Sequence, residues 1–321
     1  MSATGLKRVT RRDPCPVCGR QKWCSITEDE GMVICMHVSA GSVKPSKNGG
    51  FVHVLRERDD WSVVSPVRTA PTPPPFASIE WRHAVYTALL EALPLSEHHA
   101  DHLVSKRKLS DLTVARNQYA TRPDSLLKMF EVARDLAALH DLNHVPGFFQ
   151  DSFDCWHFMI GEPGFFIPVR DPHGRIQALQ IRQDKGPPRY LWFSSSHQPC
   201  GASSGAPVHF ARPWRAASAG EAIITEGALK ADIAAERLDA CVVAIAGVSA
   251  FRDDFGQWLK RELPSLRSVF VAFDMDWHAK PEVRRSLLRL LASLEAASLP
   301  GGLLDWHSSK GLDDLLTREG G

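Results

Sequence analysis

Short apolar segments alternate with amphipathic segments through the last third of the sequence, and this alternation restricts the fold more than any other feature. The apolar segments AIIT, ACVVAIAG and SVFVAFDMD predict buried strands. The intervening segments ALKADIAAERL, FRDDFGQWLKREL and EVRRSLLRLLASLEAA, and the final GLDDLL, have the spacing of helices. Strands separated by helices pair mostly in parallel, with helices on both faces. Residues 216–321 are therefore predicted to form an α/β domain, with its chemistry at the carboxyl ends of the strands.

Carboxylates follow two of these predicted strands. Glu226 follows AIIT, Asp274 and Asp276 follow SVFVAF, and a third acidic pair, Asp313 and Asp314, lies in the last helix. If the strands are parallel neighbours, the first two groups meet at one edge of the sheet, where Mg²⁺ or Mn²⁺ would offset their mutual repulsion. One acidic cluster alone would more simply be a helix cap. Two clusters, each directly after a predicted strand, favour a metal site.

A second candidate metal site lies near the N-terminus. Four of the seven cysteines occupy positions with the spacing of a closed, structural zinc site: Cys15, Cys18, Cys24 and Cys35. His37 or His53 could replace Cys24 as the fourth ligand, but four cysteines already complete a tetrahedral set. So short a segment could hardly fold without the ion.

Basic residues are concentrated in two parts of the chain. Residues 1–70 contain eleven Lys and Arg against seven Asp and Glu, and residues 161–215 contain seven against three, whereas residues 216–321 are net acidic. The basic parts could bind a polyanion and the acidic part divalent cations. Trp23 either stacks on a nucleic-acid base or covers the small core of the cysteine-rich segment.

The Pro-rich stretch SPVRTAPTPPPF predicts a linker between domains. GFFIPVRDPHGRIQALQIR predicts a β-hairpin, with RYLWF as a further strand. His98, His99 and His102 are expected at the surface, without carboxylates nearby to complete a metal site. The predicted organisation is a zinc ribbon at 1–60, a linker at 61–78, a helical region at 79–150, a small basic β subdomain at 151–215 and the α/β domain at 216–321.

The sequence lacks signals for membrane insertion or export. No apolar run approaches the roughly 18 residues that a bilayer requires. The basic N-terminal stretch has no apolar segment behind it, so it does not predict a secretory signal. These features predict a cytoplasmic protein.

The ordered motifs ITEG, FDMD and KGLDD resemble the toprim domain shared by DnaG-type primases, type IA and II topoisomerases and some nucleases. The predicted hairpin and PPRYLWFSS resemble the segment that precedes toprim in DnaG-type primases. With the zinc ribbon in front, the resemblance covers most of the chain. The chain is most similar to primase-like proteins of phages, plasmids and integrative elements.

The resemblance implies roles for individual carboxylates. Glu226 would be the acid/base residue nearest the metal and one of its ligands. Asp274 and Asp276 would bind catalytic Mg²⁺ or Mn²⁺, and Asp313 and Asp314 would complete the acidic patch as further ligands of the ion. The four cysteines would hold a structural Zn²⁺.

The resemblance also implies contacts with template or nucleotide. The candidates are Arg170, Arg182, Arg189, Tyr190 and Lys230. Lys230 stands where the family usually has an acidic residue, Ala279 replaces an expected glycine, and Trp192 replaces an expected asparagine. The zinc ligands are also spaced differently from those of the cellular enzyme. These departures place the chain in a divergent branch.

The expected function is synthesis of short primers from nucleoside triphosphates on single-stranded DNA, during replication of a phage, plasmid or other mobile element. No G-x-x-x-x-G-K-[ST] motif occurs, so a helicase would act in trans. The alternatives are a toprim nuclease and a non-catalytic DNA-binding accessory protein. Lys230 and Ala279 favour the accessory protein, whereas the basic hairpin and the zinc ribbon favour the primase over the nuclease.

Overall fold

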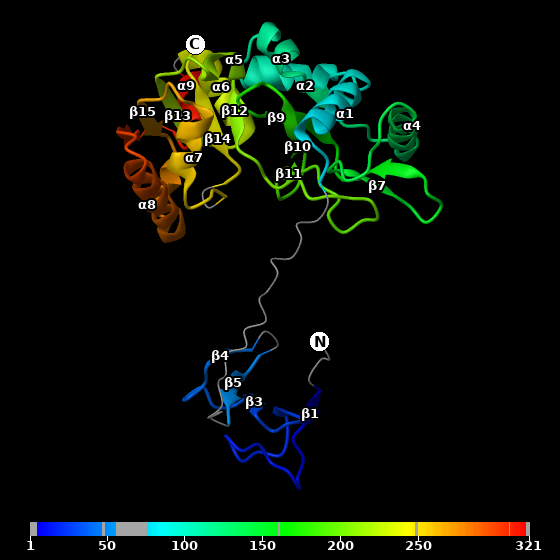
Figure 1. The fold of residues 1–321 in the computed structure, drawn as a ribbon, viewed down its shortest axis with the longest axis vertical. Coiled ribbons are helices and arrows are strands. Elements are labelled where there is room, and N and C mark those ends of the chain that lie inside the picture. Colours follow the sequence, from blue (N-terminus) through cyan, green and yellow to red (C-terminus); the bar gives the residue numbers. More distant parts are fainter. Residues whose placement is uncertain are drawn as a thin grey trace. The chain divides into compact units, whose positions relative to one another are not determined.

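The chain divides into two compact units, residues 1–71 and 72–321 (Figure 1). The computed structural model describes residues 5–46, 49–55, 76–159, 161–247, 250–307 and 309–318. Most of the predicted linker, residues 61–75, lies outside the described residues.

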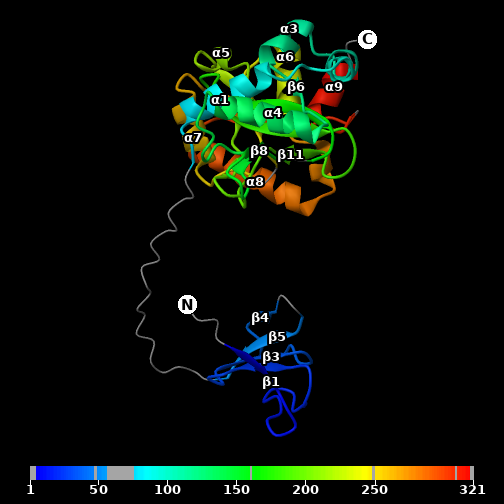
Figure 2. The same ribbon diagram turned by 90° about the vertical axis from the view of Figure 1, so that its right-hand side faces the viewer.

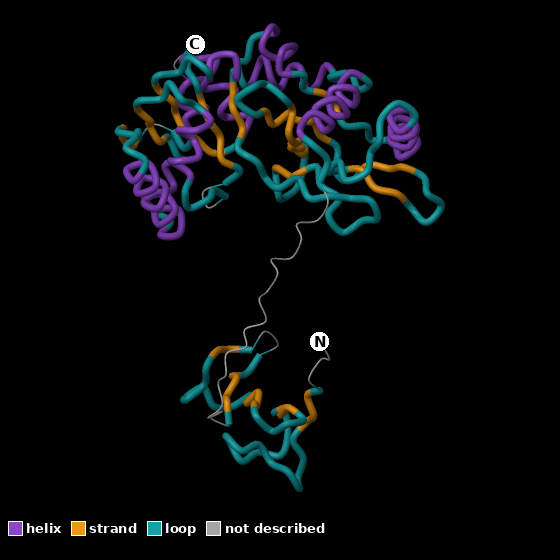
Figure 3. The backbone as a smooth tube through the Cα atoms, in the orientation of Figure 1, coloured by secondary structure: helices purple, strands orange, loops and turns teal. Residues whose placement is uncertain are grey.

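The N-terminal unit is a small antiparallel sheet with the strand order β1-β2-β3-β5-β4. Its described residues form strands and loops but no helix (Figure 3). The buried core is minimal, comprising Val9, Val33 and three of the four clustered cysteines. The strands are β1 (Leu6–Arg8), β2 (Ser25–Thr27), β3 (Met32–Cys35), β4 (Lys44–Pro45) and β5 (Phe51–Val54).

The C-terminal unit begins with the predicted helical region. Four serines cap its α-helices, because Ser78, Ser96, Ser110 and Ser125 each accept a hydrogen bond from a backbone N–H of the first turn. The first and last of these helices lie side by side (Figure 2). The elements are α1 (Ile79–Glu91), α2 (Glu97–Asp101), the π-helix η1 (His102–Lys106), α3 (Asp111–Asn117) and α4 (Leu126–Ala137).

The predicted hairpin is confirmed as the centre of an antiparallel sheet with the order β11-β10-β9-β6. The Asp171 carboxylate organises its turn by accepting hydrogen bonds from the backbone N–H groups of His173 and Arg175. The strands are β6 (Ala120–Thr121), β9 (Gly164–Arg170), β10 (Ile176–Gln183) and β11 (Tyr190–Trp192), and a separate two-stranded sheet contains β7 (Phe148–Gln150) and β8 (Trp156–Phe158).

The predicted α/β domain is also confirmed. Its sheet has the order β12-β14-β13-β15-β16, and every pair is parallel except β12 with β14. The first strand and the last were not predicted. The strands are β12 (His209–Ala211), β13 (Glu221–Glu226), β14 (Val242–Ile245), β15 (Ser268–Val271) and β16 (Gly301–Leu303).

Helices cover both faces of this sheet, and the alternation of side chains along the strands explains how. Ile224 and Val243 point to the core formed with α7 and α8, while Ile223 and Val242 point to the core formed with α6 and α9. None of the described helices has the length and apolarity needed to span a membrane. The helices are α5 (Pro213–Ala216), α6 (Ala228–Leu238), α7 (Phe255–Glu262), the 3₁₀ helix η2 (Met275–His278), α8 (Pro281–Ala296) and α9 (Leu312–Arg318).

Helix α6 packs against both large sheets of the C-terminal unit. Ile233 belongs to the core beneath β9, whereas Ala234 belongs to the core beneath β14. Between them, the buried Asp232 accepts a hydrogen bond from the Tyr119 hydroxyl at 2.6 Å and lies 3.1 Å from His209 Nε2. The hairpin sheet and the α/β sheet are therefore joined through one helix.

Candidate functional site

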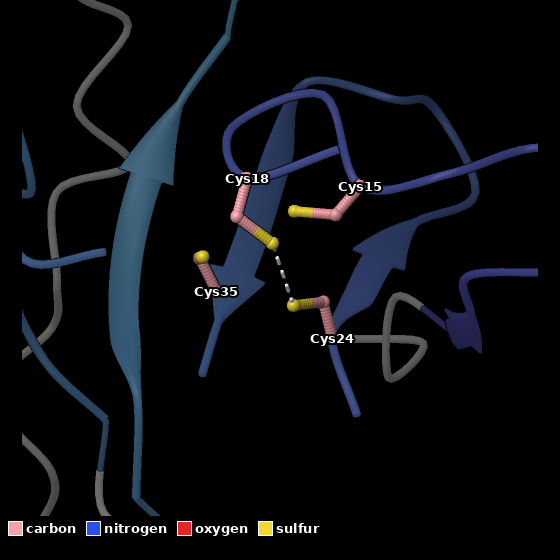
Figure 4. Close-up of side chains that lie close together, drawn as sticks. All are labelled: Cys15, Cys18, Cys24 and Cys35. Carbon is pink, nitrogen blue, oxygen red and sulfur yellow. Dashed lines mark hydrogen bonds between the residues drawn. The ribbon is translucent and has the colours of Figure 1, made fainter. Parts of the chain in front are cut away.

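The four clustered cysteines converge on one point (Figure 4). Their sulfur atoms all lie within 4.8 Å of one another, and the Sγ atoms of Cys18 and Cys24 are 3.7 Å apart. Zinc bound to four sulfurs at about 2.3 Å would hold them about 3.8 Å apart. The set therefore fits a structural Zn²⁺.

The local sequence shapes this thiol group. The N–H of Gly19 donates to the Cys15 carbonyl at 2.8 Å, and the positive φ of Gly19 (68°) allows the chain to close the tight turn that contains the first two cysteines. Burial raises the pKa of Cys24 to about 12, so a cation would be needed to hold its thiolate.

Neither candidate histidine joins the cysteine group. His53 Nε2 lies 2.9 Å from the Val38 carbonyl oxygen, and His37 Nδ1 lies 3.2 Å from Arg20 Nη1. The four-cysteine alternative is the one that the geometry supports. Trp23 is 69% exposed, so it does not cover the core of this unit.

The predicted carboxylates of the C-terminal unit lie near one another, and their role as metal ligands stays a prediction. Glu226 ends the central strand β13, and its Oε1 accepts the backbone N–H of Asp274 at 3.4 Å. Asp274 follows the neighbouring strand β15, and Asp276 lies in η2. Gly227, with φ of 80°, turns the chain sharply from the strand into α6. We refer to Glu226, Asp274 and Asp276 as the carboxylate site.

The environment of Glu226 favours its protonated form. Burial and the nearby Asp274 carboxylate raise its pKa to about 7, although Lys230 acts in the opposite direction. A carboxylate in this range can exchange a proton near neutral pH or bind a cation that replaces the proton.

Three lysines surround the carboxylate site. Lys230 Nζ contacts Asp274 Oδ1, and Lys280 Nζ lies 2.6 Å from Asp276 Oδ2. Lys310 Nζ lies 3.4 Å from Asp274 Oδ2 and 3.6 Å from Asp276 Oδ2. Sequence reasoning missed the last two lysines, although Lys280 stands four positions after Asp276 and Lys310 precedes the GLDD segment.

Asp313 and Asp314, the third acidic pair, lie in different environments. Asp313 is only 1% exposed, and its Oδ2 lies 3.1 Å from Nη1 of Arg107, the residue that follows η1. Burial raises the pKa of Asp313, and its Oδ1 has no hydrogen-bond partner. The more exposed Asp314 lies 3.7 Å from the same guanidinium. Arg107 was not predicted, although it stands in the basic run KRK.

The hairpin sheet borders the carboxylate site. A pocket of about 190 Å³ is lined by Gln180 and Tyr190 from that sheet and by Glu226, Gly227 and Lys230 from the α/β domain, among others. Tyr190 lies opposite Arg182 in the β10–β11 ladder. Aromatic and basic groups of the hairpin sheet therefore lie close to the carboxylates.

Known structures share this arrangement of elements. The zinc-binding and RNA polymerase domains of the Aquifex aeolicus primase match with a TM-score of 0.58, 15% identity and coverage of 76% of this chain and 59% of that one. A DnaG primase catalytic domain bound to single-stranded DNA matches with a TM-score of 0.56, 18% identity and 75% coverage of both chains. A Pseudomonas aeruginosa primase domain matches at 0.55, with 21% identity and 75% coverage of both chains.

The chain has the DnaG primase catalytic-core fold over about three-quarters of its length. This confirms the predicted fold class. Residues 218–321, which contain the carboxylate site, also match a family described as a domain of unknown function, DUF3854. No curated protein sequence matches the chain significantly.

Within this primase fold, a cluster of cations extends beyond the predicted residues. His102 Nε2, Arg107 Nε and Arg182 Nε are buried without hydrogen-bond partners. Burial and the positive charges of Arg182 and Arg107 lower the pKa of His102 to about 4. The Arg182 guanidinium is 5.6 Å from the centre of the Phe165 ring, and Arg189 donates to the Asp184 carbonyl at 2.7 Å. His102 is therefore neutral near neutral pH, and the positive charges of this cluster are those of Arg107, Arg182 and Arg189.

Arg170 does not belong to this cluster, and its contact with template or nucleotide stays a prediction. Its guanidinium donates to the Gly174 carbonyl at 2.8 Å and to Gln118 Oε1 at 2.7 Å. These two acceptors fix the Arg170 guanidinium inside the protein, where it supports the hairpin turn.

The prediction for the histidines is wrong in two respects. His99 is only 4% exposed, and Asp184, a carboxylate distant in sequence, lies 3.0 Å from its Nε2. His99 Nδ1 lies 2.8 Å from Thr121 Oγ1. His98, His99 and Asp184 place possible ligand atoms within 4.8 Å of one another. Both ring nitrogens of His99 are nevertheless engaged by the protein, so it ties α2 to the hairpin sheet.

Proposed function

We propose that the protein is a primase-like nucleotidyltransferase that synthesises short primers on single-stranded DNA. The observation that carries this proposal is the contact of Glu226 with the Asp274 backbone at the edge of a parallel sheet, where Glu226 and Tyr190 line the same pocket. The DnaG primase fold supports it. In this proposal, the catalytic domain is residues 216–321. A groove for template and nucleotide would be formed by residues 79–150 and 151–215, and residues 1–60 would bind DNA.

Each part of the site has a task in such a reaction. Mg²⁺ or Mn²⁺ bound to the carboxylates would stabilise negative charge on the phosphates. Glu226 would accept the proton of the 3′-hydroxyl as that oxygen attacks the α-phosphate of the incoming nucleotide and pyrophosphate leaves. Arg182 and Arg189 would bind phosphates, and Tyr190 would stack on a base.

The partners follow from the same proposal. Single-stranded DNA is the template, by analogy with the similar primase domain bound to single-stranded DNA. The exposed Trp23, between the basic Lys22 and the zinc-site residue Cys24, would stack on bases of that strand. The helicase would be a separate protein, and the resemblance to phage and plasmid proteins favours a role in replicating a mobile element.

A non-catalytic DNA-binding role is the second candidate function. The observation that favours it is the contact of Lys230 with Asp274, because an ammonium there competes with a metal ion. A binding protein would keep its affinity for DNA when the carboxylates are changed and would make no primers.

We expect the purified protein to produce short primers from labelled nucleoside triphosphates on single-stranded DNA with Mg²⁺ or Mn²⁺. Ribo- and deoxyribonucleotides are tested in separate reactions, and the template carries a second label that reports cleavage. Reactions without added divalent ion are the control. Cleavage without synthesis would favour a nuclease, and an absence of both would favour the accessory role.

We expect Arg189→Ala and Arg182→Ala to weaken binding of single-stranded DNA and to flatten its salt dependence. Removal of one arginine–phosphate interaction should reduce the slope of log affinity against log salt by about 0.7. Binding is measured by fluorescence anisotropy at several salt concentrations. Arg134→Ala removes an exposed arginine of α4 and is the matched control.

Because Arg182 is almost fully buried, thermal melting must show that its variant is folded. An unchanged salt slope in both folded variants would contradict a phosphate-binding role for this pair.

A further inference from the structure

Lys230 occupies the interior side of the carboxylate site. It lies in the first turn of α6, where the turn at Gly227 directs the helix away from the end of β13. Its side chain is 22% exposed, and its Nζ contacts Oδ1 of Asp274, which is 10% exposed.

The same ammonium lies close to Asp313. A Cβ atom added to Gly311 would be 2.5 Å from Asp313 Oδ1, 3.1 Å from Asp274 Oδ1 and 3.4 Å from Lys230 Nζ. These three atoms therefore surround one small space beside the Gly311 backbone. The other oxygen of Asp313 is already paired with Arg107.

The basic side chains around the acidic residues differ in burial, and this distinguishes an inner half and an outer half of the acidic cluster. In the inner half, the carboxylates of Asp274 and Asp313 face Lys230 and Arg107, which are mostly buried. A buried cation that is hydrogen-bonded to a carboxylate is not readily displaced, because removing it would leave the carboxylate charge uncompensated.

The outer half is more accessible to an added ion. Lys280 and Lys310, which approach Asp276, have side chains that are 51% and 63% exposed. Such exposed ion pairs are weak and can rearrange into water. Glu226, Asp276 and the second oxygen of Asp274 then offer carboxylate oxygens of the kind that Mg²⁺ and Mn²⁺ prefer.

We propose that Lys230 takes the place of a second divalent ion, so that the protein binds a single Mg²⁺ or Mn²⁺ at Glu226, Asp274 and Asp276. This inference rests on the metal site of the proposed function and specifies how many ions that site holds. Lys230 is then a positioning residue, which fixes Asp274 and supplies a permanent positive charge.

The test counts bound Mn²⁺ by electron paramagnetic resonance, using the zinc-loaded protein. We expect one tightly bound Mn²⁺ in the wild type and two in Lys230→Asp, where a carboxylate replaces the ammonium. Lys230→Gln should still bind one ion, about tenfold or more tightly, because a nearby positive charge is gone. Lys128→Asp, which introduces the same change at an exposed position of α4, should stay at one ion.

The outcomes separate this inference from the proposed function. Two ions in the wild type, or one ion in folded Lys230→Asp, would overturn the single-ion inference. If Lys230→Asp does not fold, an unchanged Mn²⁺ affinity in Lys230→Gln would overturn it. No bound Mn²⁺ in the wild type would overturn the inference and the metal site together, whereas one bound ion without primer synthesis would contradict only the proposed function.

Discussion

Glu226→Gln is expected to lower primer synthesis by about a hundredfold or more while leaving the affinity for single-stranded DNA within about twofold. The change removes a proton acceptor and metal ligand at nearly constant volume, and general acid–base groups contribute about 10² to 10⁴ in rate. DNA binding should persist because it depends on cations elsewhere. Primer yield and DNA affinity are measured at matched metal concentrations, and Asp276→Asn should give the same pattern with weaker metal binding.

Glu221→Gln provides the matched control for this experiment. Glu221 begins the strand that Glu226 ends, and it accepts a hydrogen bond from Ser268 at the opposite edge of the sheet. Its replacement makes the same chemical change away from the site and should leave synthesis unchanged. Wild-type synthesis in Glu226→Gln would refute the assignment of Glu226.

Because the pKa of Glu226 is raised, Glu226→Gln should also change how the stability of the protein depends on pH. Between its ordinary value of 4.5 and about 7, the folded protein binds more protons at this group than the unfolded chain does. Without added divalent ion, Glu226 therefore makes the free energy of unfolding decrease as pH rises through that range. In Glu226→Gln this contribution is absent, so stability should decrease less between the two pH values. Thermal melting at pH 5 and pH 8 measures the difference.

Replacement of Cys24 by serine is expected to abolish zinc binding and unfold the N-terminal unit. That unit has few buried apolar residues besides its cysteines, so a structural ion would supply much of its folding free energy. Elemental analysis should fall from about one zinc per chain to nearly none, and amide hydrogen exchange in residues 5–55 should rise sharply. Exchange in the C-terminal unit should not change.

Cys155→Ser is the control for the zinc experiment, since Cys155 is free and does not belong to the four-cysteine group. It should retain the zinc content of the wild type. A full zinc content in Cys24→Ser would mean that another side chain serves as the fourth ligand. Wild-type protein that is folded but contains no zinc would contradict the site as a whole.

Local sequence signals accounted for most of the α/β domain and missed its least regular strands. Helix α6 matches the predicted segment from Ala228 to Leu238, because its apolar residues recur at helical spacing and Gly227 precedes it. Strand β16 contains two glycines and only one apolar residue, Leu303, so its sequence has no strand pattern. Strand β12 has three residues, which is too short for a periodic signal.

The sequence predicted those contacts of the candidate site that lie between the ends of neighbouring strands, and no others. Glu226 and Asp274 follow adjacent parallel strands, so their meeting follows from the topology. The contact of Arg107 with Asp313 joins residues more than 200 positions apart, and no local pattern encodes it. The burial of Asp313 and the exposure of Trp23 likewise depend on tertiary packing.

Helix α6 packs against two sheets, and this affects how the C-terminal unit unfolds. A helix that contributes to the cores of two sheets cannot leave one without exposing apolar surface of the other. We therefore expect the two sheets to unfold together rather than in separate transitions. Because the carboxylate site lies at the N-terminal end of that helix, local opening of either sheet would dismantle it.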